Sequence, residues 1–61
     1  MKTKPIKIEF LFRIGQEVRN PFGYRGIVKG QYVDQGGISY FVQTMHGDNW
    51  FYEKQLLPFE E

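Results

Sequence analysis

The absence of cysteine constrains this chain more than any other feature, because the chain has only 61 residues. A chain so short buries only about 60% of the surface that its unfolded form exposes, and it is marginally stable alone. Small proteins usually compensate with disulfide bonds, a structural metal or an additional subunit. Without cysteine neither a disulfide nor a thiolate zinc site can form, and the single histidine, His46, cannot build a metal site by itself.

Aromatic residues offer another source of stability. The chain has six Phe, four Tyr and one Trp, which make up 18% of its residues. Such rings bury a large area each and could support a compact β-core. No apolar run approaches the roughly 18–20 residues that span a bilayer, and the N-terminus lacks the apolar stretch of a signal peptide. We therefore expect a cytoplasmic protein without a membrane partner.

The net charge of +1 hides an asymmetry between the two halves of the chain. Residues 1–30 carry seven Lys and Arg against two acidic residues, whereas residues 31–61 carry one Lys against five acidic residues. Clustered cations attract phosphates through counterion release, so the first half could form a basic binding face. Folding of the two halves onto each other would instead intermix their charges.

Apolar residues at every second position predict several short strands. The predicted strands cover residues 6–14, 16–19, 26–33, 38–44, 50–52 and 57–59, and one helical turn is predicted at residues 53–56. Gly26 and Gly30 lie inside the third of these strands and indicate a bulge, a bend or a close backbone approach. The turns are predicted at residues 20–23, 34–37 and 46–49, and Pro58 is compatible only with an edge strand. The pattern predicts a single all-β domain over residues 1–61.

Two segments resemble the opening of SH3-like barrels of the Tudor and KOW type: Phe12-Arg-Ile-Gly-Gln-Glu-Val18 and Gly23-Tyr-Arg-Gly-Ile-Val28. The downstream Trp50-x-x-Glu53-x-x-Leu56 is similar to the end of many small bacterial and phage proteins of this shape. The resemblance covers about residues 12–57 and implies a five-stranded barrel, preceded here by an extra N-terminal strand at about residues 4–11. The expected core is Phe12, Val18, Val28, Tyr40, Val42, Phe51 and Leu56.

Such barrels are mostly recognition modules, so the resemblance implies binding without chemistry in a small bacterial or phage accessory protein. We expect an interaction with a partner protein or with a second copy of the chain. Trp and Tyr dominate interface energetics, which makes Trp50 and Tyr52 candidate anchors. The surface predicted to bind a partner consists of Tyr24, Arg25, Tyr32, Trp50 and Tyr52. The strand at residues 6–12 could also pair with another copy by strand addition.

Nucleic-acid binding is the main alternative. Cations and rings are interleaved at Arg19, Tyr24, Arg25, Lys29 and Tyr32. Such a surface suits phosphates and stacked bases, although a pI near 8.0 is low for a dedicated nucleic-acid domain.

Two further functions follow only from the resemblance. Tudor-type barrels enclose methylated cations in a cage of rings, for which Tyr24, Tyr32, Tyr40, Trp50 and Tyr52 could supply rings and Asp48 an anion, although burial in the core is the alternative for Tyr40, Phe41 and Phe51. The chain is also distantly similar to the type II dihydrofolate reductases, whose tetramers line a pore with a Val-Gln-Ile-Tyr run. Here Asn49-Trp50-Phe51-Tyr52 matches only the tyrosine. We therefore expect no enzyme, no catalytic residue, no cofactor and no metal, with His46 serving as a turn residue.

Overall fold

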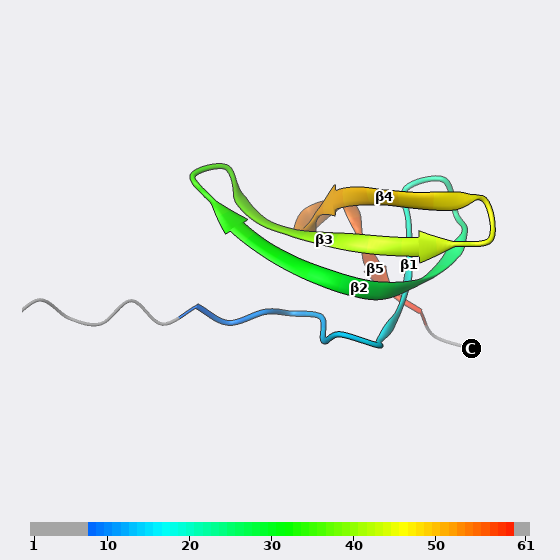
Figure 1. Ribbon diagram of the computed structural model, residues 1–61, viewed down its shortest axis with the longest axis horizontal. Coiled ribbons are helices and arrows are strands. Elements are labelled where there is room, and N and C mark those ends of the chain that lie inside the picture. Colours follow the sequence, from blue (N-terminus) through cyan, green and yellow to red (C-terminus); the bar gives the residue numbers. More distant parts are fainter. Residues whose placement is uncertain (1–7, 60–61) are drawn as a thin grey trace, which may run out of the picture.

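The computed structural model describes residues 8–59 and consists of five antiparallel strands in one sheet (Figure 1). The strands are β1 (Glu17–Arg19), β2 (Arg25–Asp34), β3 (Gly37–Thr44), β4 (Gly47–Tyr52) and β5 (Leu57–Pro58). A single 3-10 turn, η1 (Glu53–Gln55), links β4 to β5. Across the sheet the order is β4-β3-β2-β1-β5. The all-β prediction is thus confirmed.

None of the helical structure within residues 8–59 has the length and apolarity needed to cross a membrane.

The sheet curves strongly but does not close, with β4 and β5 at its two edges (Figure 1). The prediction of a closed barrel is therefore wrong. Strand β5 has only two residues, and its Pro58 has no N–H to donate, so this edge has little backbone with which to reach β4. β5 instead pairs only with β1, through the registers Val18↔Pro58 and Arg19↔Leu57.

All seven residues predicted for the core are buried, each with no more than 8% of its surface exposed. They lie on the inner face of the curved sheet and in the segments that cross it, and Ile38 packs against them. The prediction succeeded in the strands because alternation, which holds in β2 up to its bulge and in β3 and β4, places Val28, Tyr40, Val42 and Phe51 on the inner face. The core is small, and each of its members therefore carries a large share of the stability.

A bulge in β2 confirms the predicted bend at its glycines. The register with β3 shifts between Val28 and Gly30, so that Lys29 is the extra residue. Gly26 is required by close packing, since a Cβ atom there would lie 2.5 Å from Cγ1 of Val42. After the bulge, Gln31 faces Tyr40 of β3 on the inner side of the sheet.

The Tyr40 hydroxyl is the centre of a buried hydrogen-bond network. It donates to Oε2 of Glu53 and accepts the N–H of Phe12 at 3.2 Å. The same Glu53 oxygen accepts the N–H of Leu11, and the Gln31 side chain donates to the Phe12 carbonyl at 2.8 Å. We call these groups the Tyr40 network; together they hold residues 11–12 across the inner face of the sheet.

The Tyr40 network also changes the pKa of the Tyr40 hydroxyl. Burial and the hydrogen bond to Glu53 raise the pKa of the Tyr40 hydroxyl above its ordinary value of 10.0. Because folding raises this pKa, the corresponding stabilisation is complete below a pH of about 10 and is lost as the pH rises through the folded-state pKa.

Residues 8–14 form no strand, which corrects the prediction of an N-terminal strand for that part of it; residues 4–7 lie outside the described residues. The predicted alternation of apolar side chains does hold in part, because Phe12 is buried. The ring centres of Phe10 and Phe12 lie 6.2 and 5.3 Å from that of Tyr40, in edge-on contacts. The backbone of Leu11 and Phe12, however, binds side chains of the sheet rather than a neighbouring strand. Hydrogen bonds to side chains therefore take the place of the backbone hydrogen bonds between strands that the alternating pattern predicted.

The turn predicted at residues 46–49 lies one residue earlier, because Met45 and His46 form the turn and β4 begins at Gly47. Gly47 has φ 123°, a conformation that favours glycine and allows the tight connection. This shift matters for the outer surface, since it places Asp48 inside β4 opposite Gln43.

Replacing Tyr40 with Phe should test the network. The substitution keeps the ring but removes the hydroxyl, which leaves the buried Phe12 N–H unpaired and removes one of the two donors to the Glu53 carboxylate. We expect a loss of about 1–3 kcal/mol in the free energy of unfolding, measured by urea denaturation. Tyr32→Phe removes an exposed hydroxyl and is the matched control, with an expected change within about 0.5 kcal/mol. Equal losses in the two variants would contradict the role of the Tyr40 hydroxyl.

Candidate functional site

The outer face of the sheet carries a group of aromatic side chains from three strands. The register places Gly30, Phe41 and Trp50 in one row across β2, β3 and β4, and Tyr32, Ser39 and Tyr52 in the next row. Directly opposed residues project on the same side of a sheet. The Trp50 ring lies 5.2 Å from that of Phe41 and 6.2 Å from that of Tyr32. We call Tyr32, Phe41, Trp50 and Tyr52 the aromatic patch.

The missing side chain of Gly30 gives the patch its shape. A Cβ atom at this position would lie 3.3 Å from Cβ of Phe41 and 3.7 Å from Cη2 of Trp50. The indole of Trp50 therefore extends across β3 and reaches the space beside β2 that a larger residue would fill. Gly30 owes its place in this row to the bulge at Lys29.

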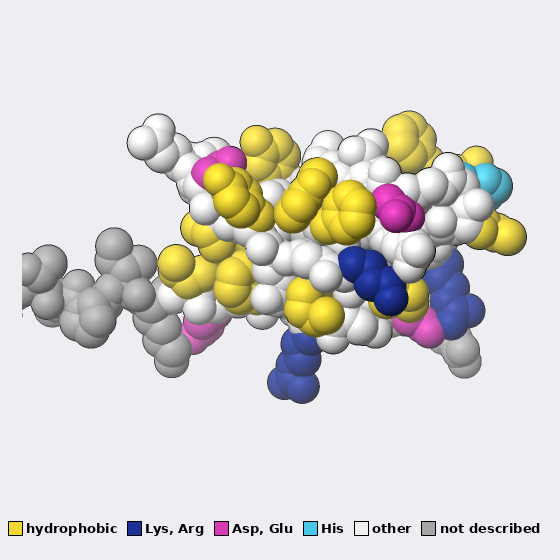
Figure 2. Space-filling model, in the orientation of Figure 1, with side chains coloured by type: hydrophobic (Ala, Val, Ile, Leu, Met, Phe, Trp, Pro, Cys, Tyr) yellow, Lys and Arg dark blue, Asp and Glu magenta, His cyan; other side chains and the backbone are white. Residues whose placement is uncertain are grey.

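Much of the patch is open to solvent. Tyr32, Trp50 and Tyr52 are 55%, 50% and 43% exposed, whereas Phe41 is half-buried between its neighbours. Figure 2 shows hydrophobic side chains gathered on this face over β3 and β4. Exposed apolar groups that are contiguous, rather than scattered singly, mark interaction surfaces on small proteins.

The two edge strands of the sheet, β4 and β5, are poorly suited to strand addition. The two-residue turn makes Thr44 and Gly47 a hydrogen-bonded pair, and the alternation of the ladder then directs the N–H groups of Trp50 and Tyr52 away from β3. These two groups bind the side-chain oxygens of Asn49 and Gln55, at 2.8 and 2.9 Å. At the other edge, β5 is two residues long and contains Pro58. Features of this kind disfavour pairing of β4 and β5 with another chain, which favours binding on a face.

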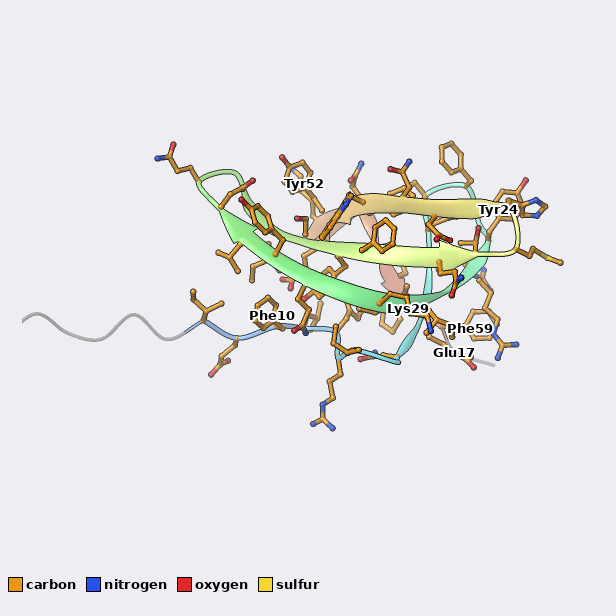
Figure 3. The ribbon with its side chains drawn as sticks, viewed as in Figure 1. Phe10, Glu17, Tyr24, Lys29, Tyr52 and Phe59 are labelled. Carbon is orange, nitrogen blue, oxygen red and sulfur yellow. The ribbon has the colours of Figure 1, made fainter. Side chains whose placement is uncertain are left out.

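The other residues predicted for partner binding lie away from the patch. Tyr24 stacks on His46 with the ring centroids 4.2 Å apart, at the end of the sheet where the β3–β4 turn lies. Arg25 forms an ion pair with Glu17. The structure therefore brings together Tyr32, Trp50 and Tyr52 of the predicted set, but neither Tyr24 nor Arg25, as the separated labels of Tyr24 and Tyr52 show (Figure 3).

The residues of the nucleic-acid alternative are also divided. Arg19 and Arg25 are opposed in β1 and β2, and their guanidinium groups lie 5.4 and 5.0 Å from the centre of the Phe59 ring. Tyr32 belongs to the aromatic patch at the far end of β2 from Arg25. Figure 3 shows Phe59 and Glu17 beside each other at the opposite end of the molecule from Tyr52. Tyr24 lies next to Arg25 at this end, whereas Lys29 and Tyr32 lie further along β2, so the predicted residues do not form one surface.

The rings suggested for a cation cage do not converge either. Tyr40 is buried in the core, while Tyr32, Trp50 and Tyr52 lie on the outer face. A hollow of about 160 Å³ is lined in part by Phe22, Tyr24, His46 and Asp48, at the β3–β4 turn. Of the rings proposed for the cage, only that of Tyr24 lines this hollow.

Sequence reasoning missed two members of the site, Phe41 and Gly30. Burial was expected for Phe41, yet its ring lies on the outer face beneath Trp50. Side chains alternate along β3, so Phe41 lies on the other face of the sheet from Tyr40 and Val42. This alternation is the signal that could have identified Phe41 as a surface residue. Gly30 could not be assigned to a row without the position of the bulge.

Titratable groups offer little for chemistry in the described part of the chain. Within residues 8–59 no group of three or more His, Asp or Glu residues is arranged to hold a metal ion. His46 lies in the turn, with its ring against Tyr24 rather than against a nucleophile. The site is thus a surface of rings.

No family model, no curated protein and no solved structure matches this chain.

Alanine substitutions at two adjacent residues should separate the outer face from the core. Trp50→Ala should retain the β-sheet circular dichroism spectrum and lose about 1–2 kcal/mol, because half of the side chain is already exposed. Phe51→Ala removes a ring that is only 8% exposed and should cost about 3–5 kcal/mol, enough to unfold so small a domain. Loss of the folded spectrum in Trp50→Ala would instead place Trp50 in the core.

Proposed function

We propose that this protein is a non-enzymatic binding module that recognises a protein surface through its aromatic patch. The proposal is carried by one observation: Tyr32, Trp50 and Tyr52 are about half exposed, and they lie together with Phe41 on one face. Tyr and Trp contribute large contact areas with few rotatable bonds, which is why they are enriched at binding hot spots. The obstructed edge strands favour docking on the face over strand pairing.

The SH3-like assignment is part of this proposal. It is supported by the five antiparallel strands and by the short 3-10 turn that separates β4 from β5. Binding modules of this shape use surface residues and need no enclosed cavity, which agrees with a core filled by seven side chains.

Nucleic-acid binding is the second candidate, and one observation favours it. Arg19 and Arg25 present two guanidinium groups on one ring, that of Phe59, which is an arrangement that could bind phosphate. It is the weaker proposal, because Glu17 already pairs with Arg25, the neighbouring Tyr24 ring stacks on His46, and Tyr32 lies apart in the aromatic patch.

Site-specific photo-cross-linking tests the proposed function. A benzophenone amino acid replaces Tyr32 in the patch or, as the matched control, Tyr24, which is exposed to a similar degree outside it. After illumination in a cell extract, position 32 should give discrete protein adducts that resist nuclease, and the added substitution Trp50→Ala should reduce them at least about tenfold.

Position 24 should give few adducts. Identical adducts from both positions would contradict binding by the patch, and adducts destroyed by nuclease would support the nucleic-acid alternative instead. Illumination without extract shows whether the chain cross-links to itself, at twice its mass of 7.3 kDa.

A further inference from the structure

Two opposite charges border the aromatic patch. Lys29 is the bulged residue of β2, and Asp48 lies in β4 opposite Gln43 of β3. Both are exposed, and Lys29 lies on the face that carries the patch (Figure 3). Within the described part of the chain neither side chain has an ion-pair partner. One flank of the patch therefore offers a free ammonium group, and the other a free carboxylate.

The arrangement of these groups is roughly symmetrical about β3. Lys29 lies between the row of Asn49 and the row of Trp50, whereas Asp48 lies in the row of Ile27, so the two charges flank β3 with an offset of about 5 Å along the strand, which the long Lys29 side chain can span. Tyr32 and Tyr52 likewise flank Ser39 in one row. Phe41 lies between the two sides, in the central strand.

A two-fold axis parallel to β3 and above Phe41 would make this face complementary to itself. Rotation about such an axis exchanges the β2 side with the β4 side and keeps each height along the strand. Lys29 of each copy would then face Asp48 of the other, which gives two ion pairs. Tyr32 would face Tyr52 of the other copy, and the two Phe41 rings would meet near the axis. Two-fold interfaces require this kind of self-complementarity.

We propose that the aromatic patch packs against the same patch of a second copy of the chain, about a two-fold axis parallel to β3. The inference rests on the proposed function and names the partner as the chain itself. Nucleic acid fits this face less well, because Asp48 would repel phosphate where Lys29 attracts it. A different protein would not require opposite charges on the two sides of β3, whereas a two-fold arrangement of this face does.

The area of the patch sets the expected affinity. Aromatic side chains bury about 150–250 Å² each when fully covered, and three of these rings are only about half exposed. With their polar neighbours, each copy would bury about 400–500 Å², at the low end for specific interfaces. The dimer should therefore be reversible, with a dissociation constant in the range of about 10–100 µM.

Sedimentation velocity over about 1 µM to 1 mM tests the proposal. The mean mass should rise from 7.3 kDa towards twice that value, and Trp50→Ala should remain monomeric. Lys29→Asp and Asp48→Lys each place like charges opposite one another at both ion pairs, so each should weaken the dimer about tenfold. Arg13→Asp is the charge-matched control for Lys29→Asp; it lies on the segment that crosses the inner face, and it should dimerise like the parent.

Mixing the two charge variants, Lys29→Asp and Asp48→Lys, is the decisive experiment. One variant carries Asp at both positions and the other carries Lys at both, so a heterodimer regains two ion pairs and should form at least as readily as the parent dimer. Failure of the mixture to dimerise would overturn the two-fold arrangement. A parent chain that stays monomeric up to about 1 mM would overturn self-association altogether. If the parent chain is monomeric, protein adducts from position 32 in cell extract would still support the proposed binding function, and the absence of such adducts would end both proposals.

Discussion

The hydrogen bonds of the Tyr40 hydroxyl are the constraint on which the rest of the structure depends. A sheet with five antiparallel strands and one open side needs a cover for its inner face, and residues 11–12 supply it. Their backbone would be costly to bury without partners, because each unpaired group loses its bonds to water. Tyr40, Glu53 and Gln31 provide those partners from three separate elements. Phe12 can therefore enter the core, where its ring contacts Tyr40.

With the inner face filled and the edge strands β4 and β5 obstructed, the outer face presents the exposed rings of the sheet for interaction. The apolar residues of each strand point to the inner face and fill it. Pro58 obstructs the β5 edge, and the side chains of Asn49 and Gln55 bind outward N–H groups of β4. Rings on the outer face contribute little to the fold of a single copy, since Tyr32, Trp50 and Tyr52 are about half exposed. Exposed rings carry an aggregation hazard that a protein without a partner for them would have reason to avoid. A small core and an exposed aromatic patch are both accounted for if a second surface covers the patch.

The sequence predicted the core better than the site, for a physical reason. Alternation, the glycines of β2 and Pro58 are all local signals, so the core residues in the strands, the bulge near Gly30 and the edge strand at Pro58 could be predicted from the chain alone. Membership of the patch depends on which residues of different strands are opposite one another, and that register cannot be read from one strand. Arg25 and Tyr32 are close in sequence but lie towards opposite ends of the ten-residue strand β2. The N-terminal segment was misjudged because alternating burial does not reveal whether the backbone binds a strand or side chains.

Residue-resolved hydrogen exchange tests most directly the claim that the inner face and the β4 edge are both closed. The amide groups that decide it are those of Phe12, Trp50 and Tyr52, each of which binds a side-chain oxygen rather than a neighbouring strand. If the account is right, all three exchange more slowly than in an unstructured peptide, and Phe12 exchanges at a rate close to that of Val42 in the centre of β3. Exchange of Phe12 at the unstructured rate would show an uncovered inner face, and the same result for Trp50 and Tyr52 would show an open β4 edge. Either result would contradict the claim that the inner face and this edge are closed.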